Sequence, residues 1–154
     1  MIRHFILALT ALLFLSACGG GGSDSGSMVE ATLPGTNVPI SFIGTYQGTL
    51  NVNASALGNS ISDSFPITIT VNEDGTIRFD GDDPDETFTV GLQNDGVFQG
   101  NLPLDQSGCT GNVGANGQVD GNNVTGTIDG SGSCEVNGLT VDVELAGDFN
   151  ATRI

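Results

Sequence analysis

The sequence predicts an all-β domain, an antiparallel up-and-down meander of eight strands. Apolar residues alternate with polar ones from Phe42 onward, turn-forming Gly, Asn and Asp residues separate the alternating stretches, and no stretch outside the N-terminal apolar run carries a helical stripe. Alternation with period two is typical of strands with one buried face and one wet face. Such a meander best hides its edges by closing into an eight-stranded barrel, and a two-sheet β-sandwich is the alternative.

The strands are placed by their alternating residues and by the turns between them. We expect them at residues 44–53, 64–72, 76–81, 86–92, 96–102, 109–120, 124–130 and 139–150, the sixth bulged or broken. Turn chemistry at residues 72–75, 93–96, 114–117, 120–123 and 136–138 supplies the positive φ angles of tight antiparallel connections.

The predicted inner face contains both large side chains and glycines. The large ones are Tyr46, Leu50, Phe65, Ile67, Ile69, Phe79, Phe88, Phe98, Leu102, Val141, Val143, Leu145 and Phe149, and the glycines are Gly48, Gly100, Gly126 and Gly147. Inward glycines permit the sharp coiling of a small barrel or leave space for a ligand. We favour a core filled by its own side chains, with a small apolar ligand in the barrel as the alternative.

The N-terminus carries an export signal. Residues 1–4 are positively charged, residues 5–14 are an apolar run too short to span a bilayer, and Leu15-Ser16-Ala17-Cys18 follows at once. This arrangement resembles the signal peptide and lipobox of bacterial lipoprotein precursors. The resemblance implies cleavage before Cys18, a diacylglycerol on its thiol and acylation of its new amine. An ordinary secretory signal with a chance cysteine is the alternative.

The lipobox resemblance also implies an address. Gly19 stands where Asp would signal inner-membrane retention, so the analogy favours the outer membrane of a Gram-negative cell. In a Gram-positive cell the same anchor would lie in the plasma membrane. The chain then divides into a signal peptide (1–17), the lipidated cysteine with a flexible Gly/Ser-rich tether (18–41) and the β-barrel domain (42–154). The tether has a root-mean-square reach of about 25 Å.

The charge of the mature chain limits its partners. From Cys18 onward 18 acidic residues stand against Arg78 and Arg153, a net charge of −16, with no Lys, His or Trp. This composition argues against nucleic acid and against an electrostatic membrane patch, both of which need basic side chains. The lipid anchor therefore remains the expected contact with the membrane.

Two cysteines remain after Cys18. Cys109 and Cys134 are an even pair in an exported chain, which favours one disulfide. The closed loop of about 26 residues would add roughly 3 kcal/mol of stability. A metal site is the alternative, but two cysteines without a mature histidine make a poor ligand set.

One acidic loop is a candidate calcium site. Five carboxylates fall within residues 80–86, namely Asp80, Asp82, Asp83, Asp85 and Glu86. Clustered carboxylates can supply several of the six to eight oxygens that calcium takes, although the spacing does not match an EF-hand. The alternative is a solvated hairpin loop whose charges discourage aggregation. No other cofactor is expected.

The two ends of the domain suggest how the barrel closes. Gly44-Thr45-Tyr46 begins the first strand, and Arg153 follows the last. A Gly-x-aromatic on the first strand with an arginine past the last resembles the lipocalin and avidin-like (calycin) barrels. There the arginine packs over the aromatic and helps to seal one end of the barrel. Here Tyr46 replaces the usual Trp, and we expect Arg153 to stack on Tyr46 as a cation–π pair.

We expect a non-enzymatic domain. Without His or Lys, hydrolase triads lack a base, which leaves only a carboxylate pair such as Asp142 with Asp148. The leading hypothesis is a membrane-anchored lipoprotein whose barrel is an interaction or structural module of the cell envelope, with acidic loops such as 80–86 as contacts for an unknown protein partner. The alternative is a carrier of a small apolar ligand inside the barrel.

Overall fold

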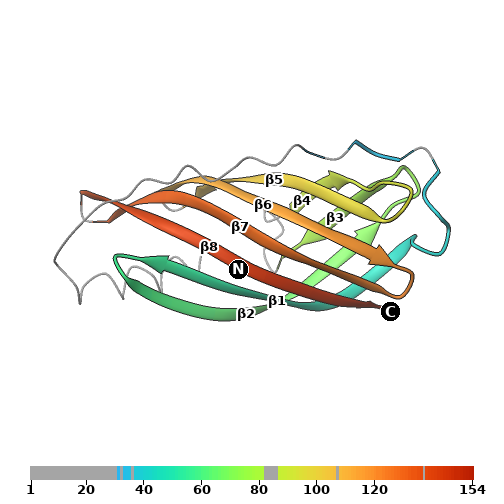
Figure 1. Ribbon diagram of the computed structural model, residues 1–154, viewed down its shortest axis with the longest axis horizontal. Helices are drawn as coiled ribbons and strands as arrows, with labels where there is room; N and C mark the ends of the chain where they lie inside the picture. Colours follow the sequence, from blue (N-terminus) through green and yellow to red (C-terminus); the bar gives the residue numbers. More distant parts are fainter. Residues whose placement is uncertain (1–30, 32, 36, 82–86, 107, 137) are drawn as a thin grey trace.

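The protein folds into one antiparallel sheet of eight strands. The computed structural model describes residues 31–154 except 32, 36, 82–86, 107 and 137 (Figure 1). The strands are β1 (Gly44–Ala56), β2 (Asn59–Val71), β3 (Thr76–Asp80), β4 (Thr87–Gly91), β5 (Val97–Gln106), β6 (Cys109–Asp120), β7 (Asn123–Val136) and β8 (Leu139–Arg153). The described part of the chain has no helix of the length and hydropathy needed to cross a membrane.

The strand order is that of an up-and-down barrel. Neighbours follow the order β4-β3-β2-β1-β8-β7-β6-β5, so the first and last strands pair in the middle of the sheet. The predicted all-β meander of eight strands is confirmed, and the single sheet excludes the two-sheet alternative. The molecule is elongated along the strands, and β3 and β4 are confined to one end of it (Figure 1).

The barrel is nearly closed, with one seam between β4 and β5. A single bridge, Leu92 with Phe98, joins the two edges in the part of the chain that the structure describes. Beside it a Cβ on Gly100 would lie 2.1 Å from Cγ1 of Val90 and 3.3 Å from Cζ of Phe88. Side chains therefore fill the seam where backbone hydrogen bonds would close a complete barrel.

Several strands run further than the sequence pattern predicted. β1 and β2 pair up to Ala56 and Asn59, so most of the expected loop 54–63 is strand, closed by a turn at Leu57 and Gly58. β7 continues to Val136 instead of ending at 130. In both regions small polar residues with weak strand signals are held in the sheet by their neighbours.

The prediction of a bulged or broken sixth strand is wrong. β6 pairs with β7 without interruption from Cys109 opposite Cys134 to Asp120 opposite Asn123. Residues 114–117, which carry turn chemistry, pair with residues 126–129 in the middle of this ladder. Continuous pairing on both sides of β6 outweighs the local preference of Gly and Asn for turns.

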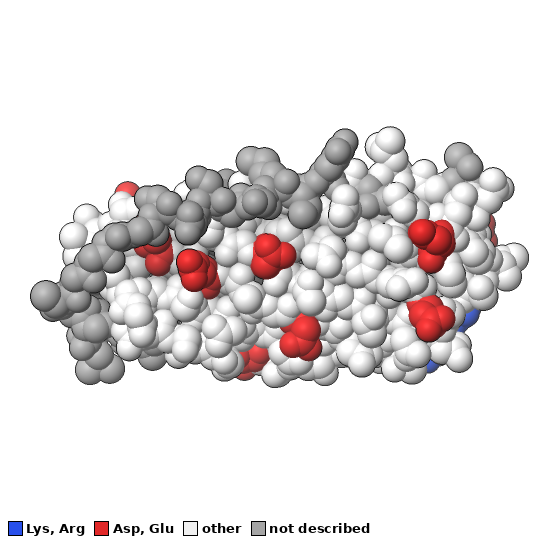
Figure 2. Space-filling view, in the orientation of Figure 1, with Lys and Arg blue, Asp and Glu red and all other residues white. Residues whose placement is uncertain are grey.

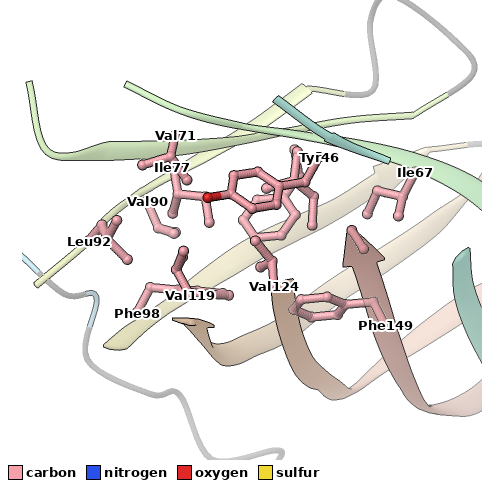
Figure 3. Close-up of a cluster of buried hydrophobic side chains, with 13 residues drawn as sticks. Tyr46, Ile67, Val71, Ile77, Val90, Leu92, Phe98, Val119, Val124 and Phe149 are labelled. Carbon is pink, nitrogen blue, oxygen red and sulfur yellow. The ribbon is translucent and has the colours of Figure 1, made fainter. Parts of the chain in front are cut away.

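The apolar interior is divided into two clusters. The end with the turns at 72–75, 93–96 and 121–122 is called the sealed end, and the end with the turns at 57–58, 108 and 138 is called the disulfide end. Side chains from strands all round the barrel converge in the sealed-end cluster (Figure 3). Its buried members are Tyr46, Ile67, Ile69, Val71, Ile77, Phe79, Val90, Leu92, Phe98, Val119, Val124, Phe149 and Ala151. The disulfide-end cluster consists of Val52, Ala54, Ala56, Cys109, Cys134, Val141 and Val143.

Aromatic rings occupy the middle of the barrel. The ring centroid of Phe79 lies 5.6 Å from Phe88, 5.5 Å from Phe98 and 5.6 Å from Phe149. Such spacing is within the range of favourable aromatic pairs. The four rings therefore fill the space beneath the seam.

Two facing glycines make room for these rings. A Cβ on Gly126 would lie 2.3 Å from the carbonyl oxygen of Asn116 and 2.4 Å from Cζ of Phe149. A Cβ on Gly117 would lie 2.6 Å from Cζ of Phe98. Real Cβ atoms do not approach so closely, so these positions require glycine for the coiling of the sheet and for ring packing. At this level of the barrel the interior is filled.

Candidate functional site

The segment before β1 covers the sealed end. Val38 and Phe42 pack against the sealed-end cluster. The N–H of Gly35 donates to the carbonyl of Leu92 at 2.8 Å, and the N–H of Asn37 donates to Oδ1 of Asn94 at 3.2 Å. Among the described residues from Gly35 onward, the predicted tether therefore contacts the barrel and covers this end.

Tyr46 lies beneath this cover. Its side chain is fully buried, and its hydroxyl lies 2.6 Å from the carbonyl oxygen of Phe42 and 2.9 Å from that of Gly121. The hydroxyl proton thus ties β1 to the segment before it or to the β6–β7 turn. Burial raises the pKa of Tyr46, and the positive charge of Arg153 opposes that shift. The sequence analysis did not predict the contacts of the Tyr46 hydroxyl. The feature that could have indicated them is a single tyrosine among the apolar residues of the inner face.

Arg153 is the last residue of β8 and does not lie beyond it, contrary to the expectation from the sequence. It stands directly opposite Tyr46 in the β1–β8 ladder. Its guanidinium donates to the carbonyl oxygen of Ser41 at 2.8 Å and to that of Ile43. The same group lies over Gly44, where a Cβ would come within 3.0 Å of Nε. Arg153 therefore holds the covering segment against the barrel end, and its stacking on the Tyr46 ring stays a prediction.

The predicted disulfide is present. Cys109 and Cys134 lie directly opposite each other on β6 and β7, with Cα atoms 3.9 Å apart, and are joined through their sulfurs. Both residues are buried, at 1% and 4% exposure. The bond therefore locks the β6–β7 hairpin at its open end and forms part of the disulfide-end cluster.

The acidic loop lies mostly outside the described residues. Asp82, Asp83, Asp85 and Glu86 fall there, so the calcium prediction is untested for them. Asp80, at the end of β3, forms an ion pair with Arg78, with Nη2 to Oδ1 at 2.6 Å and Nε donating to the same oxygen at 2.8 Å. Within the described chain no three His, Cys, Asp or Glu side chains come together as metal ligands. Cys18, the proposed lipid attachment point, also lies outside the described residues.

The two carboxylates of the enzyme hypothesis are far apart. Asp142 and Asp148 lie on the outer face of β8, opposite Ser133 and Thr127 of β7. Six residues of strand separate them by about 20 Å at 3.4 Å per residue. Paired glycosidase carboxylates lie about 5–10 Å apart, so these two cannot act on one bond.

The outer face of β2, β1 and β8 forms a shallow polar groove. It is lined chiefly by Asn51, Asn53, Ser62, Ser64 and Asp148. Ser64 donates to Oδ1 of Asn51 at 2.8 Å, and Nδ2 of Asn51 donates to Asp148 at 3.0 Å, so three strands are joined by one row of side chains. The groove offers amide and hydroxyl groups to a partner.

Carboxylates elsewhere on the outer surface are spaced apart. On β7 and β8, Asp129 lies opposite Ala146, and Glu144 lies opposite Ser131, so like charges never face each other across this ladder. Figure 2 shows them scattered along one face, while the arginines lie at the end where β8 terminates. Carboxylates on this face are therefore separated by uncharged side chains.

No protein-family model matches the chain, and no curated protein has a sequence similar to it.

Proposed function

We propose that this chain is a lipid-anchored protein of the bacterial cell envelope, whose barrel is a non-enzymatic interaction module acting through its outer surface. The observation that carries the proposal is the filled interior beneath the seam. There the rings of Phe79, Phe98 and Phe149 occupy the space that a carrier of this size would keep for its ligand. The surface therefore remains as the place where partners bind.

The anchoring part of the proposal is supported by the N-terminal sequence. A charged start, a short apolar run and Leu15-Ser16-Ala17-Cys18 follow one another in the order that processing requires. Two or three acyl chains on Cys18 would hold the domain permanently, because each buried methylene contributes about 0.8 kcal/mol. The analogy with lipoprotein sorting favours the outer membrane of a Gram-negative cell.

The non-enzymatic part is supported by the side chains at hand. The chain from Cys18 onward contains no His or Lys, its two remaining cysteines are joined in a disulfide, and the carboxylates proposed as a pair are far apart. The polar groove on β2, β1 and β8 is a candidate contact surface, since its amides and hydroxyls can hydrogen-bond to a protein or a glycan.

Anchoring is tested by expressing the full chain in a Gram-negative host and measuring its intact mass in the membrane fraction. We expect the mass of the chain from Cys18 plus a diacylglycerol and an amide-linked acyl chain. The matched Cys18→Ser variant should lack this mass and leave the membrane. A wild-type chain that is soluble, or that starts at another residue, would refute the lipid anchor.

The filled interior is tested separately by native mass spectrometry of the same purified chain. We expect no small-molecule adduct of stoichiometric amount. A persistent adduct of one lipid-sized mass would favour the carrier function, and the variant Phe98→Trp would then report ligand binding by its fluorescence, because the natural chain contains no tryptophan.

A further inference from the structure

The two ends of the barrel differ in charge. At the sealed end the turns carry Glu73 and Asp74, Asp95, and Asp120. At the disulfide end, residues 56–59, 106–109 and 136–139 contain no charged side chain, and Glu135 lies just before the last of these turns. The hairpin tips of the disulfide end are therefore uncharged, whereas the sealed end carries acidic turns together with Arg153 at the end of β8.

Two leucines project from the turns of the disulfide end. Leu57 is 50% exposed at the β1–β2 turn, and Leu139 is 69% exposed beside the β7–β8 turn. Both turns lie at the same end of the long axis (Figure 1). Gly108 forms the third turn at this end. The tips of these hairpins are thus apolar or neutral, and half or more of each leucine is exposed. Ile40 and Ile154 are also exposed at the sealed end, but the turns there are acidic.

Leu57 occupies a position that does not suit it. Its φ is +52°, in the left-handed region, and Gly58 follows at +76°. A two-residue hairpin turn of this kind favours Asn-Gly or Asp-Gly, because a bulky side chain is strained there. An exposed leucine retained in a strained position, where asparagine would fit better, points to a use for its side chain.

We infer that the disulfide end of the barrel touches a lipid bilayer through Leu57 and Leu139, which insert below the headgroups. The inference rests on the proposed lipid anchor, which holds a bilayer within reach of the domain. Apolar side chains on uncharged turns are what a membrane interface accepts, whereas the acidic turns of the sealed end are repelled by anionic headgroups.

The anchor permits this orientation. Gly35 is bound to Leu92 at the sealed end, so in this orientation the chain between Cys18 and Gly35 would have to cover the length of the barrel. Residues 19–34 span about 55 Å when extended, at 3.4 Å per residue. The fifteen residues of β8 cover about 50 Å along the strand, or about 38 Å along a barrel axis tilted by about 40°. The extended length of the tether therefore exceeds the length of the barrel, and this orientation requires the tether to be stretched beyond its root-mean-square reach of about 25 Å.

The experiment uses single tryptophans, since the natural chain has none. Leu57→Trp and Leu139→Trp place the probe at the disulfide end, and Val97→Trp is the matched control, because Val97 is 38% exposed and begins β5 at the sealed end. Each variant, as the full lipidated chain, is inserted into nanodiscs of phosphatidylcholine and anionic phosphatidylglycerol, with and without brominated acyl chains. We expect bromine to quench the first two variants about twofold, as it does for side chains at the headgroup–acyl boundary, and to leave Val97→Trp unchanged.

A second arm separates this inference from the proposed anchor. The unlipidated chain from Cys18 onward has one free thiol, since Cys109 and Cys134 are paired, so it can be coupled at Cys18 to a maleimide lipid in the same nanodiscs. Quenching of the leucine-position variants in this arm supports membrane contact even if cells do not lipidate Cys18. Equal quenching at all three positions, or at none, overturns the contact while leaving the lipid anchor unaffected. If the quenching disappears when fewer protein copies are present per nanodisc, the leucines contact a second copy of the chain and not the lipid. That result would also overturn the inference of membrane contact.

Discussion

Reduction of the Cys109–Cys134 disulfide should lower the stability of the domain by a predictable amount. The bond closes a loop between residues 25 apart. Loop-closure entropy for about 26 residues is about −12 cal/mol/K, or about 3.5 kcal/mol at 25 °C. The native structure loses little else, because both cysteines are already held opposite each other by the β6–β7 ladder.

The assay is thermal unfolding of the full chain followed by circular dichroism, with and without a reducing agent. For a domain of this size about 3.5 kcal/mol corresponds to a fall in Tm of roughly 10–20 °C. The control is the double variant Cys109→Ala/Cys134→Ala, whose Tm should be low and indifferent to the reductant. If the oxidised and reduced proteins melt within about 3 °C of each other, the unfolded-state argument is refuted.

Three further predictions concern the barrel core, the sealed end and the β1–β2 turn. Gly126→Ala should destabilise the domain by about 2 kcal/mol or more, because its Cβ meets Asn116 and Phe149 at 2.3 and 2.4 Å. Gly138 has φ +78° and no atom near an added Cβ, so Gly138→Asn should change the denaturant midpoint little. If Gly138→Asn and Gly126→Ala lost the same amount of stability, the packing argument would be contradicted. Tyr46 should ionise above its ordinary pKa of 10.0, so its contribution to stability is complete below that pH and is lost as the pH rises through the higher folded pKa. Since Tyr46 is the single tyrosine, tyrosinate absorbance follows it alone, and ionisation at the ordinary pKa in the folded protein would disprove its burial. Leu57→Asn should stabilise the isolated protein by about 0.5–1 kcal/mol, because asparagine tolerates the left-handed turn. Leu139→Asn is the matched control without that relief, and a lower Tm for Leu57→Asn would show that the leucine supports the fold.

The fold class followed from the alternation of residues such as Phe65, Ile67 and Ile69, which only a strand can bury on one face. Strand lengths did not follow, because residues 54–63 and 131–136 are small and polar and are held in strands by pairing with neighbours. The seam was also beyond prediction. It arises because β3 and β4 are five residues each while β5 has ten, so β4 cannot follow β5 along its length.

Of the candidate site residues, the cysteine pair could be predicted, because the two cysteines that remain after Cys18 have one obvious partner each. That the end of the chain lies beside the first strand follows from the order of a closed meander, whereas the inclusion of Arg153 in β8 was not predicted. The hydroxyl contacts of Tyr46 could not be predicted, because they depend on the turn at Gly121 and on the path of the segment before β1. The exposed position of Leu57 was missed because a Leu-Gly turn resembles ordinary strand sequence.

The pairing of β1 with β8 has a consequence for biogenesis. Residues about 100 positions apart in the chain, such as Tyr46 and Arg153, lie side by side. The other backbone ladders between strands form within hairpins, so β1–β4 and β5–β8 are two local meanders that are joined by this ladder, by the bridge at the seam and by the shared core. Contacts of such high sequence separation form late and slow the folding of β proteins. If the chain is exported from its N-terminus as proposed, the ladder that unites its two halves can form on the far side of the membrane only after the last strand has crossed.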